Sequence, residues 1–161
     1  MILGVCFITS LIGCVGAFRH LHKPVLMKAK DCLNAARNNL YNARRHLESG
    51  YGINWVPDEL STAALWAIEA WLIAMGHKRS GMDWAKIQLK FKDVAPKDLY
   101  DHFNKCMAGA SSLDFYLFGD SAEVDGWPPF DLDKWKKDAW QYLEDTERFV
   151  ERISREVKEK G

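Results

Sequence analysis

The chain has 161 residues, about the length of one domain, of which 48% are apolar and 27% are charged. Lys and Arg together number 22, as do Asp and Glu, so the formal net charge is zero. This balance excludes an overall attraction to nucleic acid or to an anionic membrane, although not a local patch. The four cysteines form no Cys-x-x-Cys pair, which argues against a zinc finger and a dense disulfide framework. Stability must therefore come from an apolar core, which a chain of this length can bury.

The N-terminal segment 1–26 differs from the rest of the chain. Its first 18 residues carry no charged side chain, and a stretch of this length is just long enough to span a bilayer as a helix. Basic residues follow directly. Three interpretations stay open: a start codon assigned too early, because Met27 opens a helix by itself; a membrane anchor with the rest of the chain in the cytoplasm; or a secretory signal. We expect a cytoplasmic domain over 27–161, with a membrane-anchored bundle on the cytoplasmic side as the alternative if residues 1–18 are native.

Two helices are predicted first. Over 27–49, apolar residues recur at steps of three and four, which places them on one helical face: Leu33, Ala36, Leu40, Ala43 and Leu47. The segment 58–75 is apolar nearly all round, which is typical of a central, buried helix. Gly76 is expected to cap its C-terminus.

A short helix over 83–91 and a longer one from Pro96 to Gly119 follow. The longer helix has its apolar residues in register: Leu99, Phe103, Cys106, Ala110, Leu113 and Leu117. Small residues over 108–112 would allow a neighbouring helix to approach closely. Gly109 costs about 1 kcal/mol relative to alanine inside a helix, so we expect tight packing to compensate for it.

The last helix is predicted to begin at an Asp131 N-cap. Its expected buried residues are Leu132, Trp135, Ala139, Leu143, Phe149, Ile153 and Val157. Its outer face carries charge pairs at i, i+4 and is expected to be solvated: Glu144 with Arg148, Glu151 with Arg155, and Glu156 with Lys160. Because no segment alternates with period two, we predict an all-α, up-and-down bundle of four main helices plus a short extra helix.

This order of helices resembles the HEPN superfamily of nucleotide-binding domains, over roughly 27–157. Residues 36–44 read Ala-Arg-Asn-Asn-Leu-Tyr-Asn-Ala-Arg and match the family's first-helix pattern, with Asn39 in place of its aspartate. The second-helix pattern is matched at Glu69, Leu72 and Ala74, but departs from the family's glutamine at Trp66 and from its lysine at Ile73. A long loop before the final amphipathic helix is the third point of likeness. The resemblance implies a HEPN-like bundle.

The same resemblance implies a function without catalysis. Ribonucleases of the family carry an Arg followed, after four to six residues, by a His near the start of the last helix, and no Arg and His have that spacing here. Non-catalytic members commonly form homodimers and bind a partner protein, such as a minimal nucleotidyltransferase, or a nucleotide or RNA. We expect such a module, with no catalytic residue and no cofactor. The alternatives are a ribonuclease or nucleotide-handling enzyme with an unorthodox site built from Glu69, His77 or His102, and a membrane-anchored assembly bundle.

Candidate ligand or partner contacts lie in three places on or beside the predicted helices. Glu69 interrupts an apolar helix, so it either contacts a cleft or dimer seam or is hydrogen-bonded inside the bundle. The basic run His77, Lys78 and Arg79, with Lys86, Lys90 and Lys92 beyond it, could bind phosphate, as could the smaller run Arg44-Arg45-His46. Ordinary cations at helix ends and solvated lysines explain both runs without a ligand, and this is the interpretation that we favour.

The loop over 119–130 supplies the remaining candidates, Trp127 and Phe130, which flank two prolines. They either anchor a partner or cap the bundle core. No metal site is expected, because none of the histidines follows a glutamate at the Glu-x-x-His spacing of di-iron bundles. Cys32 and Cys106 fall on apolar helical faces and are predicted to be buried, inert thiols.

Overall fold

A computed structural model describes residues 28–77, 83–118 and 131–160, with the side chains of 116–118 excepted. These residues form α1 (Ala29–Ser49), the short 3₁₀ helix η2 (Ile53–Trp55), α2 (Val56–Ala74), α3 (Trp84–Val94), α4 (Lys97–Phe118) and α5 (Leu132–Lys160). No strand occurs in these ranges. The all-α prediction is confirmed, and the predicted helix bounds are correct to within a few residues.

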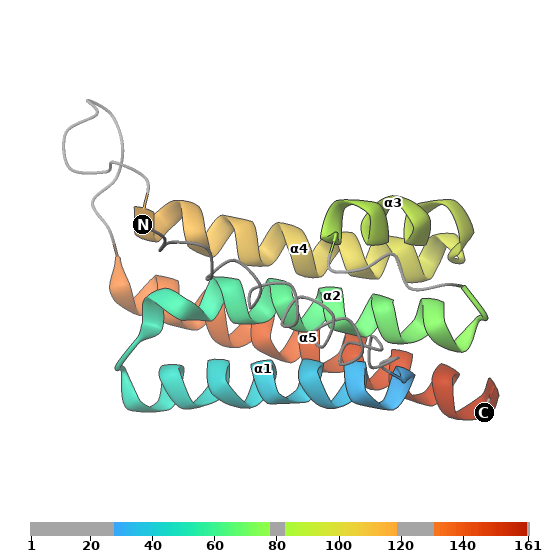
Figure 1. Ribbon diagram of the computed structural model, residues 1–161. Coiled ribbons are helices and arrows are strands. Elements are labelled where there is room, and N and C mark those ends of the chain that lie inside the picture. Colours follow the sequence, from blue (N-terminus) through green and yellow to red (C-terminus); the bar gives the residue numbers. More distant parts are fainter. Residues whose placement is uncertain (1–27, 78–82, 119–130, 161) are drawn as a thin grey trace, which may run out of the picture.

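The main helices run up and down the bundle. In Figure 1, α1 and α2 are antiparallel, as are α4 and α5, and the short α3 lies beside α4 at one end. The central helix is α2, which packs against α1, α3, α4 and α5. Its predicted burial is confirmed, because an apolar surface on every side of a helix requires neighbours on every side.

Glycine ends the first two main helices, and the prediction for Gly76 is confirmed. Gly50 takes φ +70° after α1 and donates its N–H to the His46 carbonyl at 2.9 Å. After α2, Gly76 takes φ +81° and bonds to the Ile73 carbonyl at 3.0 Å, while the N–H of His77 bonds to the Leu72 carbonyl at 2.9 Å. These two bonds form a Schellman motif, so the chain turns sharply away from the bundle axis at Gly76.

The start of α5 is fixed by Asp131, whose Oδ1 accepts a hydrogen bond from the Lys134 N–H at 3.0 Å. The N-cap prediction is therefore confirmed. One predicted core residue is wrong: Leu132 is 40% exposed, because it lies in the first turn of α5 at the very end of the bundle (Figure 1). Val157, near the other end, is only partly buried, while the middle of the helix is buried as expected. The side chain of Leu117 lies outside the described residues.

The remaining core predictions hold where they can be tested. All five apolar residues predicted for α1 are buried, and so are both helical cysteines, Cys32 and Cys106. Among the helices described, none is long and apolar enough to cross a membrane. The segment 1–26 lies outside the described residues.

Candidate functional site

The connection between α1 and α2 places two aromatic side chains in solvent. Gly50 and Gly52 both adopt left-handed backbone conformations, with φ of +70° and +71°, and the chain changes direction sharply at each of them. Tyr51, held between them, is 84% exposed, and Trp55, at the end of η2, is 56% exposed. The two glycines thus fix a short, sharp turn that presents two large rings outward.

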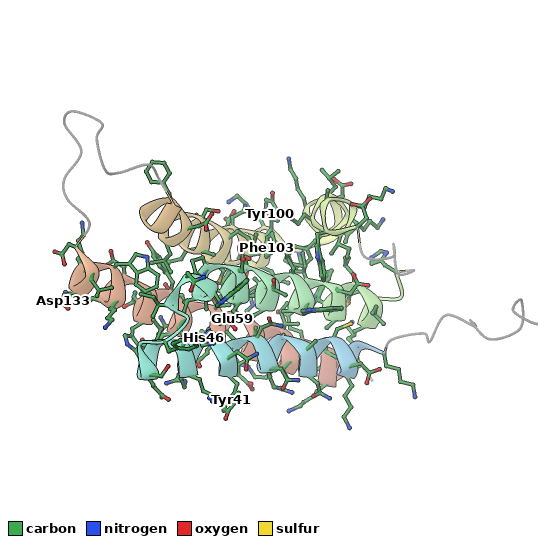
Figure 2. The ribbon with its side chains drawn as sticks, turned by 60° about the vertical axis from the view of Figure 1, so that its left-hand side comes forward. Tyr41, His46, Glu59, Tyr100, Phe103 and Asp133 are labelled. Atoms are coloured by element: carbon green, nitrogen blue, oxygen red, sulfur yellow. The ribbon has the colours of Figure 1, made fainter. Side chains whose placement is uncertain are left out.

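A contact between a histidine and a glutamate lies on the inner side of this turn. His46 Nδ1 in α1 lies 3.0 Å from Glu59 Oε2 in α2, and Figure 2 shows the two side chains together between these helices. Burial raises the pKa of Glu59, and the neighbouring imidazole opposes that rise. A Cβ added at Gly52 would lie only 3.3 Å from two atoms of the imidazole. The imidazole therefore packs closely against the turn that carries Tyr51 and Trp55.

Two further apolar side chains are exposed at the same end of the bundle. Phe115, in the last turn of α4, is 53% exposed, and Leu132 in the first turn of α5 is 40% exposed. Figure 1 shows that the C-terminal ends of α1 and α4 and the N-terminal ends of α2 and α5 meet at this end. We call the four side chains Tyr51, Trp55, Phe115 and Leu132 the apolar end.

Charge is unevenly distributed around the apolar end. On the α1–α2 side, the exposed charged residues nearest the aromatic pair in sequence are both acidic, Glu48 and Asp58. On the α4–α5 side, exposed carboxylates also lie next to Phe115 and Leu132 in sequence, namely Asp114, Asp131 and Asp133, and the exposed lysines Lys134 and Lys137 follow. Both halves of the apolar end therefore carry exposed aromatic and acidic side chains, and the two lysines lie on the α5 side only.

A polar cluster at the α4–α5 seam is occupied by structural contacts. Asp145 is 5% exposed and accepts hydrogen bonds from Arg148 and from Lys105, whose Nζ lies at 3.0 Å. Burial by itself would raise the pKa of Asp145, but these two cations lower it overall. The Cys106 thiol contacts the Asp145 carbonyl at 3.8 Å, and burial raises its pKa to about 11. Such a thiol stays protonated at neutral pH, so the cluster offers no activated cysteine.

His102, at the same seam, packs its ring edge-on against Phe149 with a centroid distance of 5.2 Å. Burial lowers the pKa of this histidine, so the neutral imidazole is favoured. Its place against the core is that of a packing residue.

A second polar network joins three helices at the other end of the bundle. The indole N–H of Trp71 in α2 donates to Glu156 Oε2 at 2.8 Å, and Glu156 Oε1 accepts from Arg152 Nε at 3.2 Å. Arg152 also donates to Asp98 Oδ2 in α4 at 2.6 Å. The buried indole N–H is thus satisfied by a carboxylate that is itself paired.

The residues singled out in the sequence are not gathered into one visible site. Glu69 is 2% exposed within α2, and His77 is half-buried just beyond the end of that helix. Their roles as ligand or partner contacts stay predictions. Four further candidates lie outside the described residues: Lys78, Arg79, Trp127 and Phe130. Among the residues with described positions, no group of three or more His, Cys, Asp or Glu could hold a metal ion.

The basic run at the end of α1 is divided by the fold. Arg44 donates two hydrogen bonds to the Glu147 carboxylate, at 2.7 and 2.9 Å, and its guanidinium lies 5.5 Å from the Trp140 ring centroid. His46 turns toward Glu59. Arg45 alone of the three is exposed. The run of three basic residues therefore supplies a single outward cation.

Comparisons with known protein families, with curated proteins and with solved structures found no match to this chain. The exposure of the aromatic pair Tyr51 and Trp55 was not predicted from the sequence. An aromatic residue between two glycines, as in Gly50-Tyr51-Gly52, predicts an exposed ring, because so short a turn cannot cover a phenol side chain.

Proposed function

We propose that this chain is a non-catalytic helical binding module that forms a homodimer through the apolar end. One observation carries the proposal: four of the six large apolar side chains that are exposed in the described residues lie at one end of the bundle. Exposed aromatic residues concentrated in one region are typical of protein interfaces, where they supply most of the binding energy.

The position of the two lysines on the α5 side, across the apolar end from Asp58, favours a second copy of the chain as the occupant. In a two-fold symmetric contact, each half of one apolar end meets the other half of its partner. Trp55 and the nearby Asp58 would then face Leu132 and Lys134 of the second copy. Apolar surface would meet apolar surface, and the carboxylate of Asp58 would meet the ammonium group of Lys134.

The resemblance to the HEPN superfamily supports the same function, because non-catalytic members of that superfamily commonly dimerise and bind partner proteins. A minimal nucleotidyltransferase is the kind of partner that the resemblance implies. Such a partner would bind the assembled dimer.

The dimer is tested by sedimentation velocity of the full chain over a range of concentrations. We expect a concentration-dependent dimer, and we expect Trp55→Ser to weaken it by at least about tenfold, as truncation of an aromatic hot spot does. Leu89→Ser is the matched control, because Leu89 is also an exposed large apolar residue, at 62%, but lies on α3. A monomer at every concentration, or an equal effect of both substitutions, would refute the proposed interface.

A charge exchange tests the two-fold arrangement separately. Asp58→Lys alone is expected to weaken the dimer, because it brings two lysines together. Combining it with Lys134→Glu is expected to restore the dimer, because the pair is then reversed. If the double variant is as weak as the single one, the two residues do not face each other.

A further inference from the structure

The helix α1 carries exposed charges of both signs at both of its ends. Near its N-terminus, Lys30 is followed directly by Asp31, and near its C-terminus Arg45 is followed one turn later by Glu48. All exposed charged residues of α1 and its N-cap are Lys28, Lys30, Asp31, Arg37, Arg45 and Glu48. Each end of the helix therefore presents at least one cation and one carboxylate to a partner.

Two of these charges oppose the dipole of the helix. Lys30 is the second residue of α1, and Glu48 is the last but one. A cation is unfavourable near the positive N-terminal end of a helix, and a carboxylate is unfavourable near the negative C-terminal end. The charge of Glu48 acts on Arg44 one turn earlier, but that guanidinium is already bonded to Glu147 at 2.7 Å. Both charges are accounted for if a partner outside this chain pairs with them.

Lys30 and Glu48 are the two ends of one row of side chains. Positions that recur at alternating steps of four and three residues lie along one face of a helix. From Lys30 these positions are Lys30, Asn34, Arg37, Tyr41, Arg44 and Glu48, which we call the α1 row. Arg44 is half-buried and the other five are exposed. Figure 2 shows Tyr41, near the middle of the row, on the side of α1 that points away from the bundle.

The α1 row is complementary to a second copy of itself that runs in the opposite direction. A two-fold axis at the level of residue 39 pairs position 30 with 48, position 34 with 44 and position 37 with 41. Lys30 of each copy then meets Glu48 of the other. Arg37 of each copy meets the ring of Tyr41, which is a cation–π arrangement. The row thus combines two ion pairs at its ends with two aromatic contacts at its centre.

The charges beside the row fit the same arrangement. Asp31 and Arg45 flank the row on one side, and antiparallel packing brings Asp31 of one copy toward Arg45 of the other. The N-cap Lys28 adds a cation at the end where Glu48 of the partner lies. None of these pairs places two charges of the same sign opposite each other, and both exposed carboxylates of α1 are matched by cations.

Contacts within the chain hold the centre of the row in place. Arg37 Nη2 donates to Ser154 Oγ in α5 at 2.7 Å. The guanidinium of Arg45 lies 5.8 Å from the ring centroid of Tyr41, within the range of a cation–π contact. Side chains that are already ordered lose less conformational entropy when they bind. Arginine and tyrosine are also among the residues that contribute most at protein interfaces.

We propose that α1 is a second self-association surface, which packs antiparallel against α1 of another copy of this chain. The α1 row contains none of the four side chains of the apolar end, so the contact does not depend on the proposed dimer. Two different two-fold contacts on one chain link the copies into assemblies larger than a dimer. Exposed ion pairs supply most of the α1 contact, so it is weak and sensitive to salt.

Other arrangements fit this surface less well. A parallel pair of α1 helices would place Lys30 against Lys30 and Glu48 against Glu48. A uniformly acidic partner would pair with the cations but would repel Asp31 and Glu48, and a uniformly basic partner would repel the cations. Only a partner with alternating charges matches the whole length of α1, and an antiparallel copy has that pattern.

The test is sedimentation velocity of the full chain at low and at high salt. Tyr51→Ser combined with Trp55→Ser is the background for the α1 variants, because it removes both aromatic side chains of the apolar end and leaves α1 unchanged. In this background we expect a dimer at low salt that dissociates at about 1 M salt, where the screening length is about 3 Å. The original chain is expected to form species larger than a dimer at low salt.

Charge reversal tests the antiparallel pairing. In the same background, Lys30→Glu alone or Glu48→Lys alone places like charges opposite each other twice, and each is expected to weaken the dimer by about tenfold or more. An equal mixture of the two variants is expected to associate, because both pairs across the axis are then again of opposite charge. Each substitution places a charge that the helix dipole favours, so α1 is expected to stay folded.

Lys90→Glu is the matched control, because it makes the same change of charge at an exposed position of α3 and leaves α1 intact. The helical content and thermal midpoint of each variant, followed by circular dichroism, show that it is folded. A chain that is monomeric at low salt in the Tyr51→Ser and Trp55→Ser background would overturn the α1 contact, whether or not the original chain dimerises through its apolar end. The α1 contact would also be refuted by a control that weakens association as much as Lys30→Glu, or by reversed variants that fail to associate when mixed.

Discussion

The ring of Tyr142 in α5 lies directly against the backbone of Gly109 in α4. A Cβ built at Gly109 would be 2.4 Å from Tyr142 Cδ1 and 2.8 Å from Cγ. These ring atoms lie close to the Tyr142 backbone, and the ring packs against the core. A rotation of the side chain therefore cannot relieve the contact without disturbing that packing. The absence of a side chain at position 109 therefore sets how closely α4 and α5 approach.

Gly109→Ala is expected to destabilise the protein. The substitution gains about 1 kcal/mol in helix propensity, but overpacking against Tyr142 typically costs about 1–3 kcal/mol. We expect a net loss of about 1–2 kcal/mol in the free energy of unfolding, measured by urea denaturation, and a melting temperature lower by a few degrees. Ser111→Ala, at an exposed position of the same helix, is the control and is expected to change stability little.

A double-mutant cycle isolates the cause of that loss. In a Tyr142→Ala background the clash is gone, so Gly109→Ala is expected to be neutral or stabilising through helix propensity alone. If alanine at 109 is equally destabilising with and without the tyrosine ring, the close approach is not what requires the glycine.

The buried carboxylate of Asp145 is expected to make the free energy of unfolding decrease in acid. Its pKa is lower in the folded protein than the ordinary value of 3.8, so it contributes stability above that value, and the contribution is lost as the pH falls toward the lowered pKa. Asp145→Asn is expected to cost about 1–2 kcal/mol at pH 7, and the difference from the original chain should shrink in acid. Asp101→Asn, which breaks an exposed pair with Lys97, should cost under about 0.5 kcal/mol.

His102 is expected to make the stability of the fold depend on pH in a higher range than Asp145 does. Because burial lowers its pKa in the folded protein, the unfolded chain binds a proton more readily as the pH falls through the ordinary value of 6.5. Its contribution to stability is therefore complete at neutral pH and declines below that value. The stability difference between the original chain and His102→Gln should shrink between about pH 7 and pH 5, as chemical denaturation at each pH would reveal. A difference that stays constant would contradict this account.

The hydrogen bond from Trp71 to Glu156 links α2 to α5, and a substitution can remove it while keeping an aromatic ring at position 71. Trp71→Phe keeps an aromatic side chain that can pack edge-on against Phe91, but it removes the indole donor. We expect a loss of about 1–2 kcal/mol in the free energy of unfolding. Because Glu156 also pairs with Arg152, Glu156→Gln should lower stability as well, and the two effects should not add.

The sequence by itself determined the helices and their core faces. The row from Leu33 to Leu47, the all-round apolar character of α2, the stop at Gly76 and the cap at Asp131 were all predicted correctly. Each depends on residues within a few positions of one another along the chain, where the period of the α-helix is fixed by backbone geometry. Even the close packing at Gly109 followed from a short run of small residues.

Only the tertiary structure decided which charged and aromatic side chains are available to a partner. The sequence pairs Arg148 with Glu144 as part of a solvated face, but the fold buries Asp145, and Arg148 bonds to that carboxylate instead. Arg44 and His46 look like free cations along the chain and are paired across helices with Glu147 and Glu59. Such pairs join residues far apart in sequence, so they depend on which helices lie side by side and at what rotation. Helical periodicity does not contain that information, because it describes each helix alone.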